Sequence, residues 1–324
     1  MASTSLSIIR PLASPPGLQI SPPQLPPRPN RHRVCCFSRG ISTEKTLTQI
    51  ESSGVIACLR ANSAELAIEA ACAALHGDIS VLEIVMSTPG VFEVVLQQLV
   101  HDHPTRVLGV GTVLNVEDAK RAMIAGAKFL MSPAMVKGIL DDFQDSEVLY
   151  IPGVMTPTEI LSAYDAGAKI VKVYPVSALG GSQYISAIKK PFPHISMVAS
   201  QGITTDSVGE YIAQGASSVV LSDAIFDKEA MGQKNFTKIY QLANAAALHG
   251  NEAVDRRQTR APLLEVFGIW ILVGVSLELL FAFGKGFVRS QKQLVTLGGV
   301  LFWLFRCVFG LYGIQWFFRA TRNN

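Results

Sequence analysis

Cysteine and histidine are scarce in this sequence, whose 324 residues include five cysteines and six histidines. No two cysteines stand in a Cys-x-x-Cys pair, and His101, His103 and His249 lack the regular short spacing of metal ligands. A small domain held together by disulfides and a zinc-binding module are therefore excluded as fold types. We expect no metal site in this protein.

Acidic residues and lysine are missing from residues 1–43, which instead contain five arginines and many serines and prolines. This segment also lacks the apolar core of a secretory signal, whereas an Arg-rich, Ser-rich, acid-poor composition is typical of organellar transit peptides. The opening Met-Ala-Ser and the run Val34-Cys35-Cys36 favour a plastid address. We predict that residues 1–43 are a disordered leader that directs the protein to the chloroplast; the alternative is a merely disordered N-terminus.

The net charge of +3 conceals three regions of different sign. Residues 1–43 carry a net charge of +5, residues 44–255 carry −9, and residues 256–324 carry +7. Because the long middle region is acidic, we expect no nucleic-acid partner. The middle region is also long enough to bury the core of one sizeable domain.

Residues 256–324 are strongly apolar and contain only two acids, Glu265 and Glu278. The stretches 262–284 and 294–318 are each long enough to cross a bilayer as a helix. One interpretation is a helical membrane anchor, which would make the protein membrane-associated rather than free in the stroma. The alternatives are a tail added by a faulty gene model and an apolar element that packs on a soluble domain.

The middle region alternates short apolar runs with amphipathic stretches of about a dozen residues. One such stretch, from Ala64 to Leu75, predicts a helix with an alanine-rich apolar face. Runs that are apolar throughout are typical of parallel strands buried on both faces. Eight strand–helix units favour a single (β/α)8 TIM barrel over 44–255, with a doubly wound open sheet as the alternative. The eight runs are 55–59, 81–85, 107–110, 129–131, 148–151, 170–174, 195–199 and 218–221.

Glu83 and Lys172 each interrupt one of these apolar runs. An unpaired charge is costly in such surroundings, so the two side chains are expected to face one another. Their pairing admits two interpretations, a structural ion pair or a catalytic pair at the mouth of a barrel, where the strands end.

Six motifs occur in order along the middle region. They are Val81-Leu82-Glu83-Ile84, Gly109-Val110-Gly111-Thr112-Val113-Leu114-Asn115, Met131-Ser132-Pro133, Tyr150-Ile151-Pro152-Gly153, Lys172-Val173-Tyr174-Pro175 and Gly180-Gly181. On these motifs the chain resembles the class I aldolases that cleave 2-keto-3-deoxy-6-phosphogluconate (KDPG) and 4-hydroxy-2-oxoglutarate (KHG), over roughly residues 47–250. The resemblance implies a homotrimeric (β/α)8 barrel that needs no metal or other cofactor.

The same resemblance implies a role for each residue of the site. Lys172 would form a Schiff base with a 2-oxo acid, and Glu83 would serve as the general acid and base. The remaining positions would contact the substrate: Thr112 and Pro133 in the pyruvyl pocket, Tyr174 on the imine, and Arg60 after the first strand.

The chain departs from the family pattern at two places. Ser87 stands where the phosphogluconate enzymes have an arginine that binds the substrate carboxylate, so a charged clamp becomes one neutral hydrogen bond. At the phosphate end, the chain has Ser200-Gln201-Gly202 and Ser222-Asp223, which add a side chain and a negative charge. We therefore predict a class I aldolase that cleaves a non-phosphorylated 2-oxo acid to pyruvate- or glyoxylate-type products. The alternative is a non-catalytic barrel that binds a small metabolite or a partner.

Overall fold

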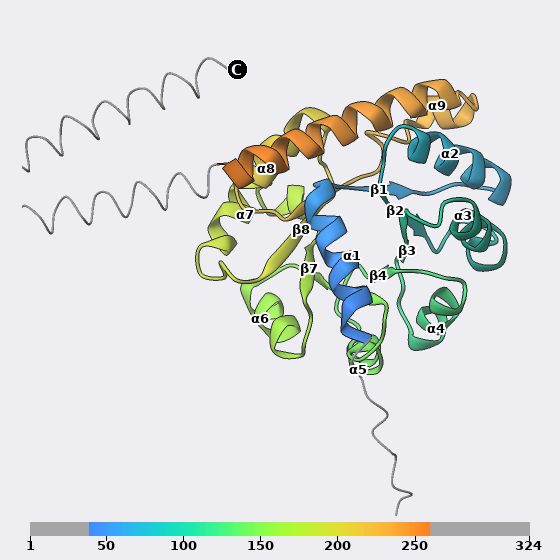
Figure 1. Ribbon diagram of the computed structural model, residues 1–324. Coiled ribbons are helices and arrows are strands. Elements are labelled where there is room, and N and C mark those ends of the chain that lie inside the picture. The colour runs from blue at the N-terminus through green and yellow to red at the C-terminus, as the bar shows by residue number, and fades with distance from the viewer. Residues whose placement is uncertain (1–38, 260–324) are drawn as a thin grey trace, which may run out of the picture. The chain divides into compact units, whose positions relative to one another are not determined.

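Residues 39–259 form a ring of parallel strands surrounded by helices in the computed structural model, and these are the residues that the structure describes (Figure 1). Each strand is short and almost wholly buried. The strands are β1 (Val55–Leu59), β2 (Val81–Val85), β3 (Val107–Gly111), β4 (Phe129–Met131), β5 (Leu149–Ile151), β6 (Gly153–Val154), β7 (Ile170–Val173), β8 (Ser196–Ser200) and β9 (Ser218–Leu221).

The strand order shows that the sheet closes on itself. Neighbours run β5-β4-β3-β2-β1-β9-β8-β7-β6, and every pairing is parallel. The first strand therefore pairs with both the second and the last, which excludes the doubly wound open sheet. The two ends of the order, β5 and β6, are consecutive in sequence and are separated by Pro152 alone. The predicted run 148–151 ends before this proline, which lacks the N–H that a ladder needs, and the two-residue strand β6 beyond it is an addition to the eight predicted strands. The TIM-barrel prediction is confirmed.

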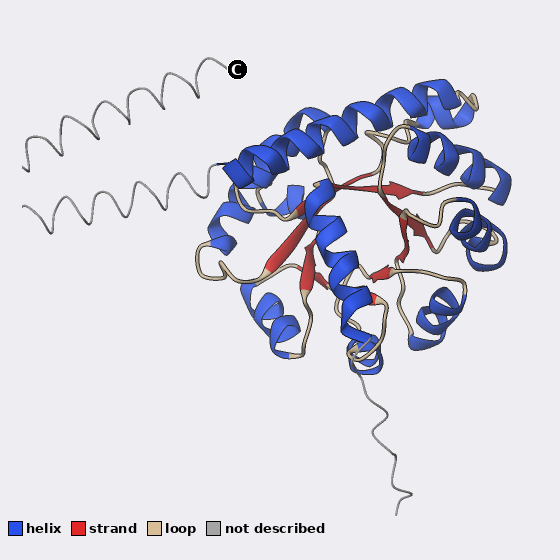
Figure 2. Cartoon of the chain, in the orientation of Figure 1, coloured by secondary structure: helices blue, strands red, loops and turns tan. Residues whose placement is uncertain are grey.

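The helices form the outer layer around the ring (Figure 2). The predicted helix that begins at Ala64 is present as α2, and it buries Ala67, Ala70, Ala71, Ala74 and Leu75 as expected. The full set comprises α1 (Arg39–Ser53), α2 (Ala64–His76), η1 (Val91–Leu96), α3 (Gln97–Asp102), α4 (Val116–Ile124), α5 (Lys137–Phe143), α6 (Pro157–Asp165), η2 (Val176–Leu179), α7 (Ser182–Lys189), η3 (Thr205–Ser207), α8 (Val208–Ala213) and α9 (Lys228–Gly232), followed by helical residues 236–259.

Helix α1 lies across one end of the ring of strands (Figure 2). Its Ile50 is fully buried and packs with Leu47 against side chains that fill the interior of the barrel. This helix closes the end at which the strands begin, so the functional site must lie at the opposite, carboxyl end. Helix α1 starts at Arg39, so the last residues of the predicted leader are helical, while residues 1–38 lie outside the described part.

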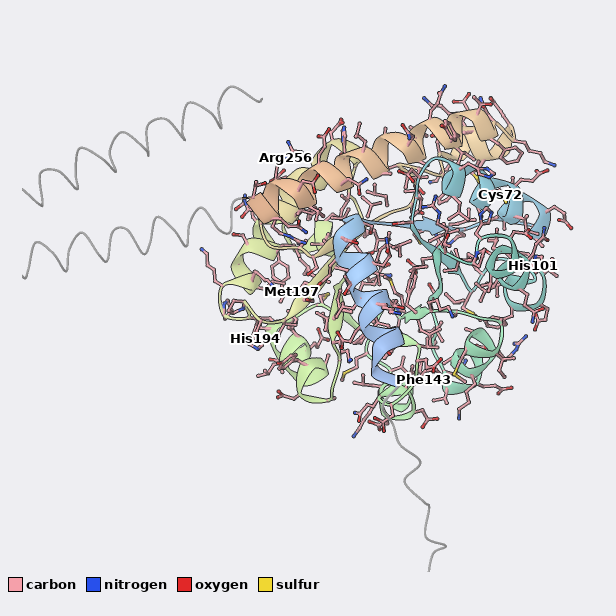
Figure 3. All side chains as sticks on the ribbon, in the orientation of Figure 1. Cys72, His101, Phe143, His194, Met197 and Arg256 are labelled. Carbon is pink, nitrogen blue, oxygen red and sulfur yellow. The ribbon has the colours of Figure 1, made fainter. Side chains whose placement is uncertain are left out.

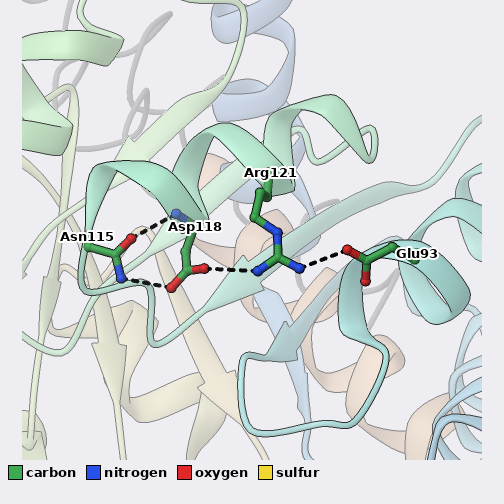
Figure 4. Close-up of polar contacts among 4 residues, drawn as sticks. All are labelled: Glu93, Asn115, Asp118 and Arg121. Atoms are coloured by element: carbon green, nitrogen blue, oxygen red, sulfur yellow. Dashed lines mark hydrogen bonds and ion pairs between the residues drawn. The ribbon is translucent and has the colours of Figure 1, made fainter.

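A polar network fixes the start of α4 (Figure 4). Asn115 caps this helix: its side-chain oxygen accepts a hydrogen bond from the Asp118 N–H at 2.8 Å, and its amide donates to the Asp118 carboxylate at 2.8 Å. Arg121 then donates to Glu93 of η1 at 2.8 Å. The end of the Gly-Val-Gly-Thr-Val-Leu-Asn motif is therefore structural, because Asn is one of the residues that best satisfies free N–H groups at a helix start.

The last described helix runs through residues 236–259 and so passes the predicted domain boundary at residue 255. Within residues 39–259 no helix is both long enough and apolar enough to cross a membrane. The two predicted membrane spans, 262–284 and 294–318, lie outside the described residues.

Candidate active site

Lys172 and Glu83 meet inside the barrel from strands that are not neighbours in the sheet. Lys172 is on β7 and Glu83 is on β2, and the Lys172 Nζ lies 3.9 Å from the Glu83 Oε1. The side chains are 9% and 1% exposed. The predicted pair is therefore present and nearly dry, and such a site strengthens every electrostatic interaction within it.

The position of Glu83 depends on a missing side chain on the adjacent strand. A Cβ atom at Gly111 of β3 would lie 1.6 Å from the Glu83 Oε1, well inside any possible contact. Two residues earlier on the same strand, a Cβ at Gly109 would lie 2.5 Å from the ring of Phe129. The two glycines of this motif are thus gaps that accommodate a carboxylate and an aromatic ring, which motif reasoning did not anticipate.

Cys58 is a neighbour of this pair that the sequence patterns did not reveal. It lies on β1 directly opposite Glu83 in the strand register and belongs to the interior of the barrel. Burial, followed by the nearby Glu83 carboxylate, raises the pKa of the Cys58 thiol well above its ordinary value. The thiol therefore stays neutral, and it does not compete with Lys172 as a nucleophile.

One oxygen of Glu83 is free to act on a bound molecule. The Oε2 atom is buried and has no hydrogen-bond partner within residues 39–259. A buried carboxylate oxygen without a partner is costly, and sites that retain one are often functional. This oxygen belongs to the carboxylate that pairs with the Lys172 amine, so it is placed to exchange a proton with a substrate bound to that amine.

Tyr174 follows β7 and lies beside the lysine at the mouth of the barrel. The Lys172 Nζ is 5.4 Å from the centroid of the Tyr174 ring, and the tyrosine is 36% exposed. The resemblance places an aromatic residue next to the imine. Since an aromatic face favours a nearby positive charge, Tyr174 is in a position to stabilise a cationic imine as well as the free ammonium.

The loop that follows β4 is held rigidly at the mouth. The Tyr150 hydroxyl lies 2.7 Å from the Ser132 Oγ and accepts a hydrogen bond from the Val136 N–H at 3.0 Å. Next to Ser132, Pro133 packs tightly on Gly153. A Cβ atom added to Gly153 would lie 2.2 Å from the carbonyl carbon of Pro133. Pro133 is half-buried, and Thr112 is exposed at the end of the neighbouring β3 with a positive φ of 63°.

Arg60 and Ser87 are both exposed, at the carboxyl ends of the adjacent strands β1 and β2. The guanidinium of Arg60 lies close enough to Cys58 to lower the pKa of its thiol slightly, although burial dominates in the opposite direction. Arg60 thus places a positive charge at the mouth of the barrel, at the end of the strand next to β2. Ser87, after β2, is the position at which the phosphogluconate enzymes have an arginine.

The opposite side of the mouth carries the residues predicted for the phosphate end. Ser200 is buried, Ser222 is half-buried and Gln201 is exposed with a φ of 87°. The predicted negative charge of Asp223 is present but not isolated, because the Lys228 Nζ lies 3.6 Å from its carboxylate. Both side chains are largely exposed, so this ion pair offsets the charge without contributing much stability.

No cluster of three metal-ligating side chains occurs among the residues that the structure describes. His101, for example, lies on α3 in the outer helical layer, away from the strand ends (Figure 3), and pairs with Asp102.

A sequence model described as KDPG and KHG aldolase matches residues 47–242, which is more than half of the chain. The chain belongs to the KDPG and KHG aldolase family. The resemblance inferred from the motifs is thereby confirmed, and the matched segment coincides with the barrel.

Individual aldolases of this family resemble the chain over nearly their whole length. The 2-dehydro-3-deoxy-phosphogluconate aldolase of Dickeya dadantii is 27% identical over 205 residues, which cover 63% of this chain and 94% of that enzyme. The KHG/KDPG aldolase of Escherichia coli K12 is 26% identical with the same coverage. The KDPG aldolase of Legionella pneumophila, solved with pyruvate captured as a covalent carbinolamine, is 29% identical with a TM-score of 0.58, covering 62% of this chain and 97% of that one.

Proposed function

We propose that this aldolase cleaves a 2-oxo acid through a Schiff base on Lys172. The observation that carries the proposal is the buried Lys172–Glu83 pair, whose nitrogen and oxygen are 3.9 Å apart across the barrel interior. The pyruvate carbinolamine in the Legionella pneumophila relative supports it, because that species is the adduct of an amine with the carbonyl of pyruvate.

Lys172 begins the reaction as a neutral amine that attacks the carbonyl carbon of the substrate. Loss of water from the carbinolamine yields an iminium, which accepts the electron pair of the C3–C4 bond as that bond breaks. The C4 hydroxyl becomes an aldehyde, and Glu83 takes its proton. Glu83 then returns a proton to C3 of the enamine, and hydrolysis of the imine releases pyruvate and restores the amine.

The substrate carboxylate requires a partner at the mouth, and we assign this role to Arg60. Thr112 and Pro133 would enclose the pyruvyl group on the β3 and β4 side, with Tyr174 against the imine. Ser87 would contribute at most one neutral hydrogen bond, weaker than the charged contact that an arginine makes.

Reduction in the presence of pyruvate tests the proposal directly. Borohydride should fix pyruvate to Lys172 in the full-length protein, and peptide mass spectrometry should locate the adduct. Lys172→Met should abolish the adduct. Lys169→Met is the control and should not, since Lys169 immediately precedes β7 but is exposed and paired with Glu44. A folded wild-type protein that forms no adduct would favour the alternative, a barrel that only binds a metabolite or a partner.

We also propose that the aldolase forms a homotrimer and that it is located in plastids. The exposed apolar side chains of Leu161 and Tyr164 on α6 support self-association, and the arginine- and serine-rich leader supports plastid import. Light scattering of the purified protein tests the first proposal. Import into isolated chloroplasts, followed by fractionation of stroma and membranes, tests the second and shows whether residues 256–324 act as an anchor.

A further inference from the structure

Two side chains meet across the loops that follow β7 and β8. The Ser177 hydroxyl, in η2, donates a hydrogen bond to the side-chain oxygen of Gln201. Gln201 has a φ of 87°, in the left-handed region that residues other than glycine rarely adopt. A strained residue whose side chain is used in a specific contact at the mouth of an active site is a candidate functional feature.

Ser177 also covers the backbone beside Gln201. A Cβ atom added to Gly202 would lie 2.6 Å from the Ser177 Cβ, so the serine packs directly on this glycine. Ser177, Gln201 and Gly202 form one contiguous unit, which we call the Ser177–Gln201 bridge. Gln201 and Gly202 are both exposed, so the bridge places a side chain at the open surface of the loop after β8, where a ligand would meet it.

The bridge lies beyond the reacting carbon along the strand direction. Lys172 is opposite Val198 in the register of β7 and β8, and Gln201 follows Val198 by three residues. At about 3.3 Å per residue, the bridge is roughly 10 Å further toward the mouth. With the pyruvyl group on the Thr112 and Pro133 side, this is where the aldehyde part of the substrate must lie.

The charges in this region disfavour a dianion. The loops after β7, β8 and β9, residues 174–181, 201–204 and 222–228, contain one basic residue, Lys228, which is already paired with Asp223. Asp227 adds a second acid, although its carboxylate caps α9. A phosphate group would meet neutral hydrogen-bonding groups and a negative balance of charge, whereas a hydroxyl group would be matched by serine and glutamine.

We propose that the Ser177–Gln201 bridge is a specificity determinant that restricts the aldehyde part of the substrate to a short group without phosphate. This inference rests on the proposed aldolase function of the same site. It assigns Ser177 a role that the motifs do not indicate, and it makes the bridge, rather than the charge of Asp223 alone, the reason for excluding phosphate.

The test compares two substrates that differ by the phosphate alone, 2-keto-3-deoxygluconate and its 6-phosphate. We expect the wild-type protein to have the higher kcat/KM with 2-keto-3-deoxygluconate. Gln201→Gly removes the bridge and suits the left-handed backbone, so it should fold and shift the ratio toward the phosphorylated substrate by about tenfold or more, the effect of one regained hydrogen bond to a charged group. Ser177→Ala, which loses only the donor, should produce part of this shift.

Asp78→Gly is the matched control. Asp78 also has a left-handed φ, of 70°, but it precedes β2 at the opposite end of the barrel, so the ratio should not change. An unchanged ratio in Gln201→Gly, or a wild-type protein that prefers the phosphorylated substrate, would overturn the inference. Borohydride trapping of pyruvate on the same samples separates the failures: an adduct with an unchanged ratio refutes only the role of the bridge, whereas no adduct on Lys172 refutes the aldolase function and the inference with it.

Discussion

Replacing Gly111 with alanine should disable the site by displacing Glu83. The new Cβ would lie 1.6 Å from the Glu83 Oε1, whereas an ordinary carbon–oxygen contact is about 3.3 Å or more. The carboxylate must therefore retreat by roughly 1.5 Å, and a shift of this size is large for a group that transfers protons. We expect turnover to fall by about 100-fold or more, and overpacking of the barrel to cost about 1–3 kcal/mol of unfolding free energy.

Gly109→Ala is the matched control, because the three atoms nearest to its Cβ would all belong to the Phe129 ring, the first at 2.5 Å, rather than to Glu83. Urea unfolding should show a similar loss of stability in both variants, whereas steady-state cleavage of 4-hydroxy-2-oxoglutarate should fall sharply only in Gly111→Ala. If Gly111→Ala keeps its turnover, or if the two variants lose activity equally, then the gap at Gly111 does not control the position of Glu83.

Three further outcomes test other parts of the structure. Glu83→Gln should still be trapped with pyruvate by borohydride but should lose about 10²- to 10⁴-fold in turnover, since the imine forms on the lysine while proton transfer is impaired; unchanged turnover would exclude Glu83 as the acid and base. Burial raises the pKa of the Cys58 thiol above its ordinary value of 9.0. Above pH 9.0 the thiol is therefore ionised in the unfolded chain but neutral in the folded protein, so the free energy of unfolding declines with rising pH until the pKa of the folded protein is passed. Cys58→Val should flatten the pH dependence of urea unfolding above pH 9.0, and an identical slope would show that the thiol does not contribute. Thr156→Ala should cost about 1 kcal/mol in urea unfolding, because Thr156 and Glu159 cap each other's backbone N–H groups at the start of α6, at 3.3 Å and 2.8 Å; an unchanged midpoint would contradict that value.

Secondary structure was largely predictable because its signals are local. Uniformly apolar runs marked the strands, and the alanine face of α2 followed from its 3.6-residue period. Gly126, Gly167 and Gly215 lie just after α4, α6 and α8, and all three have a left-handed φ, between 97° and 110°, which glycine adopts readily at helix ends. The predicted fifth run ended before Pro152, and the strand β6 beyond the proline was missed because two residues are too few to form an apolar run.

The candidate site was only partly predictable. Two charged residues inside apolar runs predicted that Lys172 and Glu83 would meet, since neither is tolerated alone in a dry interior. The role of Gly111 was not accessible in the same way, because the space it leaves is used by a side chain from another strand. The bridge between Ser177 and Gln201 was hidden for the same reason, since it joins loops that are adjacent only in the closed barrel.

The sequence by itself determined the order of strands and helices, the acidic middle region and the family, since each is carried by composition, period or motif along the chain. The tertiary structure decided which of the two sheet topologies forms, how close the lysine and the carboxylate lie, and which neighbours surround them. Those features depend on the closure of β1 against β9, which brings distant strand ends to one mouth. Position along the chain does not encode such distances; packing across the barrel does.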